Sequence, residues 1–226
     1  MKNYKENEES LLAFLTDEEL ARFRYRPQVL MYKKGDKIFS FNDPADFMYI
    51  ILEGFIKIST YLSDGREQIL YIYGKDDFVG GHNLLTHESY LYEARALTKA
   101  RLLTISKIDF DNILKKNNKV LVKVLDQSFR RIRRSEELID RLSTQNADMK
   151  VAKLLLDLAD DVGIVKKDGV LVEVHLSREE LGSYSGIVRE TLSRKLSSFE
   201  KMGLIEIIGR NEILITNMKA LEKMTS

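Results

Sequence analysis

Four polar side chains that could read or bind another molecule lie close together near the C-terminal end of the chain: Arg189, Glu190, Ser193 and Arg194. A helix that turns by about 100° per residue places these four at about 0°, 100°, 40° and 140° around its axis. Leu192, Leu196 and Phe199 fall at about 300°, 340° and 280° on the same scale. The spacing therefore predicts a helix that buries an apolar stripe and presents a charged face on the opposite side.

That charged face carries the chemistry needed to recognise base edges. The arginine fork matches the O6 and N7 acceptors of guanine, glutamate accepts from the cytosine amino group, and serine can take either role. A charged helix face is more often simply solvated, so the neighbouring elements decide between the two interpretations.

A second short helix is predicted directly before the charged one. Ser177 followed by Glu180 forms a capping-box pattern, which predicts a helix that begins near Arg178 and ends in the cluster Ser183–Gly186. Two short helices around a glycine-containing turn are typical of a helix-turn-helix, whose second helix enters the major groove of DNA.

Two hairpins are predicted around these helices. The stretch "IVKKDGVLVEV" turns at residues 167–169, and "IEIIGRNEILIT" turns at residues 209–211, after a C-capping Gly203. A helix-turn-helix followed by a hairpin is a winged arrangement. Residues 148–161 are predicted to form a further amphipathic helix in front of it.

A long helix is predicted over residues 119–143. Its heptad seam has spacings of 4, 3, 4, 3, 4 and 3 and consists of Leu121, Leu125, Ser128, Ile132, Ser135, Ile139 and Leu142. Packing of the helix on its own domain would explain part of the pattern, but a seam this straight favours a parallel homodimer. Ser128 and Ser135 weaken the seam in its middle, where a polar layer would fix the register or face a ligand.

The N-terminal half has the pattern of an antiparallel β-domain. Residues 28–106 contain short runs such as "FMYIIL", "FIKIST" and "QILYIY" separated by glycine and aspartate, which predict a barrel or roll. One short helix is predicted over residues 10–26, with Thr16 and Asp17 as caps, and another over residues 107–117. We therefore expect an α+β protein with a sensing domain at 1–117, a dimerisation helix at 118–143 and a DNA-binding domain at 144–226.

Composition excludes several classes of protein. The 226 residues include no cysteine, which rules out disulfides, cysteine zinc sites and cysteine-ligated iron–sulfur clusters. The three histidines, His82, His87 and His175, are too scattered to predict a metal site. The sequence has no apolar run long enough to span a membrane and no secretion signal, so we expect a cytoplasmic protein with no membrane partner. No nucleophile–base pair in motif context and no phosphate loop is present, so an enzyme is not expected.

The net charge of +1 is too small to indicate a nucleic-acid partner by itself. The first 106 residues hold 14 Lys and Arg against 16 Asp and Glu, and the rest of the chain holds 22 against 19. This difference has the sign expected of a DNA-binding C-terminal half, although it is small.

The chain resembles the cyclic-AMP receptor protein/FNR (CRP/FNR) family of bacterial transcription regulators over nearly its whole length. The matching stretches are "KKGDKIF", "YIILEGFIKIS", "SDGREQIL" and "LSREELGSYSGIVRETLSRKLSSFEKMGLI". The resemblance implies a cyclic-nucleotide-binding-like β-roll of the jelly-roll type, a dimerisation helix and a winged helix-turn-helix. It also implies a palindromic double-stranded operator, a homodimer and RNA polymerase as partners.

By this resemblance, Arg189, Glu190 and Arg194 lie where the family reads its operator, and Ser193 matches a serine of the FNR branch. The other predicted DNA-binding residues are Ser177, Arg178 and Lys195. Val188 departs from the family's usual capping serine, so the reading helix is expected to begin with a weaker cap.

The sensing domain departs from the family's nucleotide site. Members that bind cyclic AMP carry a glutamate that holds the ribose and an arginine that neutralises the phosphate, within the loop that reads "FVGGHNLLTHESYLYEARA" here. Gly81 stands where the glutamate would be, and Tyr90 and Leu91 replace the Arg-Ser pair. Without that cation a buried phosphate would lack its charged partner, so cyclic AMP is not expected in the usual mode.

A small non-nucleotide effector, partly apolar or aromatic, is the alternative that the loop and its neighbours favour. The predicted effector-binding residues are Tyr71, Tyr73, Gly81, His82, Tyr90, Ser128, Arg131 and Ser135. Several alternatives stay open: tyrosines that only pack the barrel, a haem held by His82, and a roll without any effector. A signalling module that acts through protein partners instead of DNA is the alternative function.

Overall fold

The structure of the chain is a computed structural model that describes residues 11–144, 146–209 and 211–225. Close packing divides the chain into two units. The first unit contains the described residues up to Thr60 together with Leu70–Arg134. The second contains Tyr61–Ile69 and the described residues from Ser135 onward. Two strands and one helix therefore have residues in both units.

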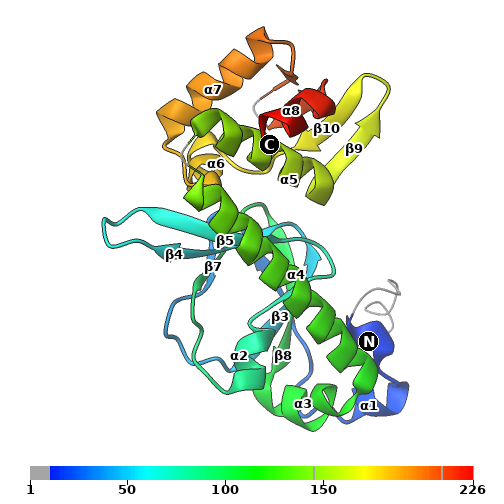
Figure 1. Cartoon of the computed structure of the whole chain (residues 1–226). Coiled ribbons are helices and arrows are strands. Elements are labelled where there is room, and N and C mark those ends of the chain that lie inside the picture. The colour runs from blue at the N-terminus through cyan, green and yellow to red at the C-terminus, as the bar shows by residue number, and fades with distance from the viewer. Residues whose placement is uncertain (1–10, 145, 210, 226) are drawn as a thin grey trace. The chain divides into compact units, whose positions relative to one another are not determined.

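The first unit is a β-roll of two antiparallel four-stranded sheets (Figure 1). One sheet has the strand order β1 (Val29–Tyr32), β8 (Ala100–Ser106), β3 (Phe47–Glu53) and β6 (Phe78–Val79). The other has the order β2 (Lys37–Phe39), β7 (Glu93–Ala96), β4 (Ile56–Tyr61) and β5 (Glu67–Tyr73). Apart from β4 and β5, neighbours in the two sheets are distant in sequence, as in a jelly roll, so the predicted roll is confirmed.

The hydrophobic core of this unit comes from the alternating inward positions of the strands. Ile50, Ile56, Leu102 and Leu103 are almost completely buried, because both sheets turn their apolar faces toward one another. Short helices cover the ends of the roll: α2 (Gly81–Thr86), α3 (Lys107–Asn112) and η3 (Leu114–Lys116). The helix predicted over 107–117 is thus two pieces, since Ile113 leaves the helical conformation.

The lead-in segment also differs from the single helix predicted over residues 10–26. It consists of η2 (Leu11–Phe14) and α1 (Asp17–Ala21), and residue 10 lies outside the described residues. Thr16 is the N-cap of α1 in a full capping box with Glu19, as its sequence pattern predicts. After α1 the chain bends at Arg24 and Tyr25, whose backbone N–H groups donate to the buried carboxylate of Asp109 at 2.7 and 3.2 Å.

The long helix α4 (Asn118–Ser143) is the helix that passes from one unit into the other. Val120, Val124 and Gln127 are buried against the roll, and Leu138 and Arg141 are buried within the second unit. Each unit therefore buries part of the helix.

The second unit is a winged helix-turn-helix. Its helices are α5 (Ala147–Val162), α6 (Arg178–Ser185), α7 (Arg189–Lys201) and α8 (Met218–Met224). Its antiparallel sheet has the order β11 (Ile205–Ile207), β12 (Glu212–Ile215), β10 (Gly169–Glu173) and β9 (Gly163–Lys166). Both predicted hairpins are present, and the turn residue Arg210 lies outside the described residues.

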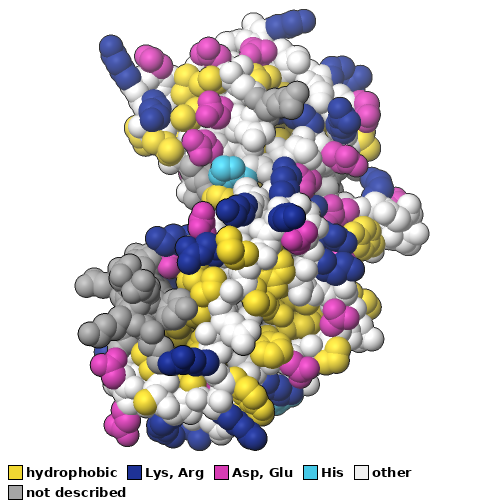
Figure 2. Space-filling view, turned by 180° about the vertical axis from the view of Figure 1, so that it is seen from behind, with side chains coloured by type: hydrophobic (Ala, Val, Ile, Leu, Met, Phe, Trp, Pro, Cys, Tyr) yellow, Lys and Arg dark blue, Asp and Glu magenta, His cyan; other side chains and the backbone are white. Residues whose placement is uncertain are grey.

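Among the described residues, no helix is both long and apolar enough to cross a membrane. On the face shown in Figure 2, basic and acidic side chains are interspersed and do not gather by sign.

Candidate functional site

The helix-turn-helix is built by a cap, a glycine turn and a buried stripe. Ser177 caps α6, its Oγ accepting from the N–H of Glu180 at 3.2 Å while the Glu180 carboxylate accepts from the N–H of Ser177 at 2.9 Å. Gly186 ends α6 with a positive φ of 71°, a conformation that favours glycine. A side chain at Gly182 would lie 2.5 Å from the carbonyl oxygen of Ile187, so this position also requires glycine for the close turn.

The reading helix α7 has the two faces that its sequence predicts. Leu192, Leu196 and Phe199 are buried against the unit, while Arg189 and the other charged positions point outward. The exposed residues of the predicted face are Arg189, Glu190 and Arg194, and Ser193 is half-buried between them. Val188 is the N-cap and its side chain forms no capping hydrogen bond, which confirms the weaker cap.

Two of the predicted DNA-binding side chains have protein contacts of their own. The ammonium group of Lys195 lies 2.6 Å from the carboxylate of Asp148 on α5, so it ties α7 to α5. Arg178 is half-buried at the start of α6, where burial lowers its pKa and the nearby Glu200 opposes that shift. Asp148 is a functional partner that sequence reasoning missed, because a 47-residue separation leaves no local signal.

A small cavity lies inside the β-roll, with a volume of about 30 Å³. Aromatic rings make most of its wall, and polar groups enter from α2 and α4. Its lining consists of Phe39, Ile58, Tyr71, Tyr73, Phe78, Val79, Gly80, His82, Asn83, Tyr92 and Arg131. Of the predicted effector-binding residues, the structure brings Tyr71, Tyr73, His82 and Arg131 together in this wall. The others, Gly81, Tyr90, Ser128 and Ser135, lie outside its lining.

The guanidinium of Arg131 is held in an aromatic cage. Its central carbon lies 4.9 Å from the ring centre of Tyr71 and 5.5 Å from that of Tyr92, distances typical of cation–π contacts. Burial alone would lower the pKa of Arg131, but the hydrogen bond with Tyr71 and the neighbouring Tyr73 and Tyr92 raise it. Burial in turn raises the pKa of Tyr73 to about 12. The wall of the cavity therefore holds a positive charge among tyrosine rings.

His82 enters the same cavity as a neutral imidazole. Ser128 donates its single hydroxyl proton to the carbonyl oxygen of Val124 at 2.8 Å, so its Oγ accepts from Nε2–H of His82 at 2.9 Å. This arrangement leaves Nδ1 of His82 as an acceptor. Burial, and after it the charge of Arg131, lower the pKa of His82 to about 4.

The residues at the family's nucleotide positions do not fit a cyclic nucleotide. A Cβ on Gly81 would lie 2.7 Å from the ring of Phe78, so there is no room for the ribose-binding glutamate. Tyr90 is committed to packing: its ring stacks on Phe39 with 3.8 Å between centres, and its hydroxyl donates to the carbonyl of Phe47 at 2.5 Å. A cavity of about 30 Å³ holds a water molecule, whereas ligand pockets usually span about 300–1,000 Å³.

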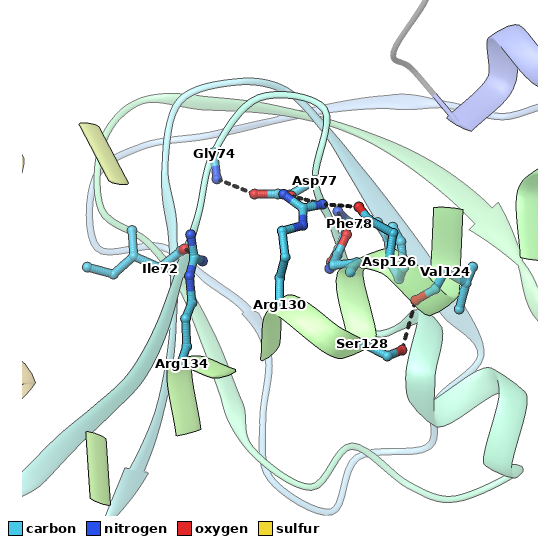
Figure 3. A network of polar contacts seen from close by, with 10 residues as sticks. Ile72, Gly74, Asp77, Phe78, Val124, Asp126, Ser128, Arg130 and Arg134 are labelled. Carbon is cyan, nitrogen blue, oxygen red and sulfur yellow. Dashed lines mark hydrogen bonds and ion pairs between the residues drawn. The ribbon is translucent and has the colours of Figure 1, made fainter. Parts of the chain in front are cut away.

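Polar contacts fasten α4 to the strands that line the cavity (Figure 3). The buried amide of Gln127 donates to the carbonyl of Phe78 at 2.7 Å and accepts from its N–H at 3.2 Å, as a neighbouring strand would. Arg134 donates to the carbonyl of Ile72 at 2.9 Å, and Arg130 lies 3.5 Å from the carboxylate of Asp77. A displacement of β5 or β6 would therefore change the contacts that hold α4.

The opposite face of α4 carries an exposed apolar stripe, defined by Val122, Leu125, Phe129, Ile132 and Ile139. This stripe differs from the predicted seam at alternate positions, since Leu121, Ser128 and Ser135 are half-buried. Ser128 faces the roll, where it bonds to His82. Phe129, which is 67% exposed, takes the neighbouring position and replaces the polar residue Ser128 in the stripe. The exposed Glu136 interrupts the stripe between Ile132 and Ile139. Its spacing of 4 and 3 to Leu125 and Ile132 was the sequence signal for this alternative.

No group of three or more His, Asp or Glu side chains gathers into a possible metal site within the described part of the chain.

The lowered pKa of His82 predicts a pH dependence of stability. The unfolded chain takes up this proton near pH 6.5 and the folded chain only near pH 4, so acid favours unfolding between these values. We expect the free energy of unfolding to fall by about 3 kcal/mol more in the native protein than in His82→Gln between pH 7 and pH 4. Urea titrations at several pH values measure this difference, and parallel curves for the two proteins would contradict it.

Two protein-family models match the chain. The cyclic nucleotide-binding domain model matches residues 29–117, and the Crp-like helix-turn-helix domain model matches residues 149–224. Electron transport regulator A of Shewanella oneidensis is 31% identical over 189 residues, which cover 81% of this chain and 73% of that protein. The CRP-like cAMP-activated global transcriptional regulator of Mycobacterium tuberculosis is 27% identical over 196 residues, 87% of each chain. FixK2 from Bradyrhizobium japonicum has the same fold, with a TM-score of 0.77 and 23% identity over 88% of this chain and 98% of that one.

Proposed function

Since this chain belongs to the CRP/FNR family of DNA-binding transcription regulators, we propose that it binds a palindromic operator as a homodimer and responds to a small effector that is not a cyclic nucleotide. The observation that carries the proposal is the exposed face of α7, where Arg189, Glu190 and Arg194 project from the second helix of a winged helix-turn-helix. Arginine and glutamate on that helix can read guanine and cytosine in the major groove.

The apolar stripe of α4 supports the homodimer. Five large apolar side chains with heptad spacing lie exposed along one helix, and a second copy of the same helix would bury them in a coiled coil. Two reading helices related by a two-fold axis require two half-sites about one turn of DNA apart. The operator is therefore expected to be a near-palindrome.

The cavity of the roll supports an effector other than cyclic AMP. It offers the cation of Arg131, the imidazole of His82 and walls of tyrosine and phenylalanine. A small ligand with an acidic or polar group on a flat apolar body would satisfy these groups, after the cavity widens to admit it. RNA polymerase as a partner and a cytoplasmic location follow from the same assignment.

Arg194→Ala tests the reading role of α7. We expect this substitution to weaken binding to the true operator by about 1–3 kcal/mol and to relax the preference for guanine at one position of each half-site. Fluorescence anisotropy with the operator and with single-base variants of it measures both effects. Lys201→Ala, at the far end of the same helix, removes an equal charge and serves as the control. An equal loss on every duplex would reassign Arg194 to a phosphate contact.

A further inference from the structure

Ser183, in the last turn of α6, makes a set of contacts that the DNA-reading role of the second unit does not explain. Its hydroxyl donates to the carbonyl of Glu67 at 2.6 Å and accepts from the N–H of Ile69 at 3.1 Å. The amide of Gln68 donates to the carbonyl of Ser183 at 2.5 Å. Three consecutive residues at the start of β5 thus hold one serine of the helix-turn-helix.

These contacts are well sheltered from solvent. The side chain of Gln68 is buried, and its amide also donates to the carbonyl of Ile69 at 3.0 Å, which fixes its orientation. Hydrogen bonds that exclude water and satisfy backbone groups are specific in geometry, because a shifted partner would leave buried polar atoms unpaired. The contact therefore defines one position of α6 relative to the start of β5.

Strand β5 continues from this contact to the cavity. Glu67, Gln68 and Ile69 belong to the second unit, and the same strand contributes Tyr71 and Tyr73 to the cavity wall in the first unit.

We propose that Ser183 is a positioning residue for operator binding: β5 holds α6 through it, and so sets the reading helix α7 in the orientation that the operator requires. The helices α6 and α7 move together, because the glycine turn between them is tightly packed. A restraint that exists before binding lowers the entropic cost of ordering both reading helices on DNA. The proposal rests on the proposed function, since it concerns the affinity for an operator.

The test uses the full-length dimer and three single substitutions. Ser183→Ala removes the hydroxyl that bonds to β5, and Gln68→Ala removes the bond from the other side. Ser185→Ala is the matched control, since the hydroxyl of Ser185 bonds to Gly182 within α6. Each protein is titrated with the selected operator and with a scrambled duplex of equal length, and its thermal unfolding is recorded.

We expect Ser183→Ala and Gln68→Ala each to weaken operator binding about tenfold, with the scrambled duplex bound as before. Ser185→Ala should bind both duplexes like the native protein. The unfolding temperatures of Ser183→Ala and Gln68→Ala should fall by only a few degrees, as expected when one or two hydrogen bonds are lost, so that both variants remain folded during the titration. Native affinity in both variants, or an equal loss on both duplexes, would overturn the positioning role. Failure of the native protein to select any operator would instead overturn the proposed function, so the two failures are distinguishable.

Discussion

Phe129→Glu is expected to convert the protein from dimer to monomer at micromolar concentration. The ring is 67% exposed on one chain and lies at the centre of the apolar stripe of α4, so in a two-fold dimer it is buried twice. Burial of an aromatic or large aliphatic side chain contributes about 1.5–3 kcal/mol. Loss of both copies of the ring should therefore raise the dissociation constant of the dimer by at least about 100-fold. Operator affinity should fall similarly, because each half-site would then be bound alone.

Sedimentation equilibrium measures the change in association, and circular dichroism checks that the fold is retained. Lys119→Gln, on an exposed position of α4 beside the stripe, changes the charge by the same one unit and should leave the dimer intact. A variant Phe129→Glu that remains dimeric would show that the copies associate through another surface.

Arg141→Ala is expected to lower the free energy of unfolding of the second unit by about 3 kcal/mol. The side chain is only 2% exposed, forms an ion pair with Asp157 of α5, and lies with its guanidinium 4.7 Å from the ring centre of Tyr184 on α6. Removal of one partner of a buried pair leaves the other charge uncompensated, which typically costs about 3–5 kcal/mol. The partial exposure of Asp157 places the expected value at the lower end.

Urea denaturation of Arg141→Ala measures this loss, and Arg141→Met combined with Asp157→Leu provides its control. The double variant should be more stable than Arg141→Ala, because it replaces both charges with apolar groups and leaves none unpaired. A single variant within about 0.5 kcal/mol of the native protein would show that Arg141 has no structural role at the end of α4.

The DNA-binding half could be predicted from the sequence because its signals are local. The capping box at Ser177 and Glu180, the turn at Gly186 and the apolar spacing of α7 each lie within a few residues of the feature that they specify. Local signals of this kind also predicted the two hairpins. The contact of Arg194 with a base edge depends on the DNA that binds α7, so this role stays a prediction.

The effector half could be predicted only in part, because its cavity is assembled from distant segments. Tyr71, His82 and Arg131 come from a strand, a short helix and the long helix, and only the folded roll brings them together. The direction of Tyr90 depends on its stacking with Phe39, about 50 residues earlier in the chain, which no spacing indicates. The seam of α4 was ambiguous by one residue, since Leu125, Ile132 and Ile139 belong to two overlapping heptads and only burial against the roll separates Ser128 from Phe129.

Selection of binding sites from a library of random duplexes, with the purified protein and no added ligand, tests the central claim most directly. We expect enrichment of a near-palindrome whose half-sites lie about one helical turn apart. Each half-site should contain a guanine, and Arg194→Ala should no longer prefer guanine at that position. If no sequence is enriched, the selection is repeated in the presence of small-molecule extract from cells. Enrichment of a single half-site would contradict the dimer, and the absence of any enriched sequence under both conditions would contradict the function proposed for this chain.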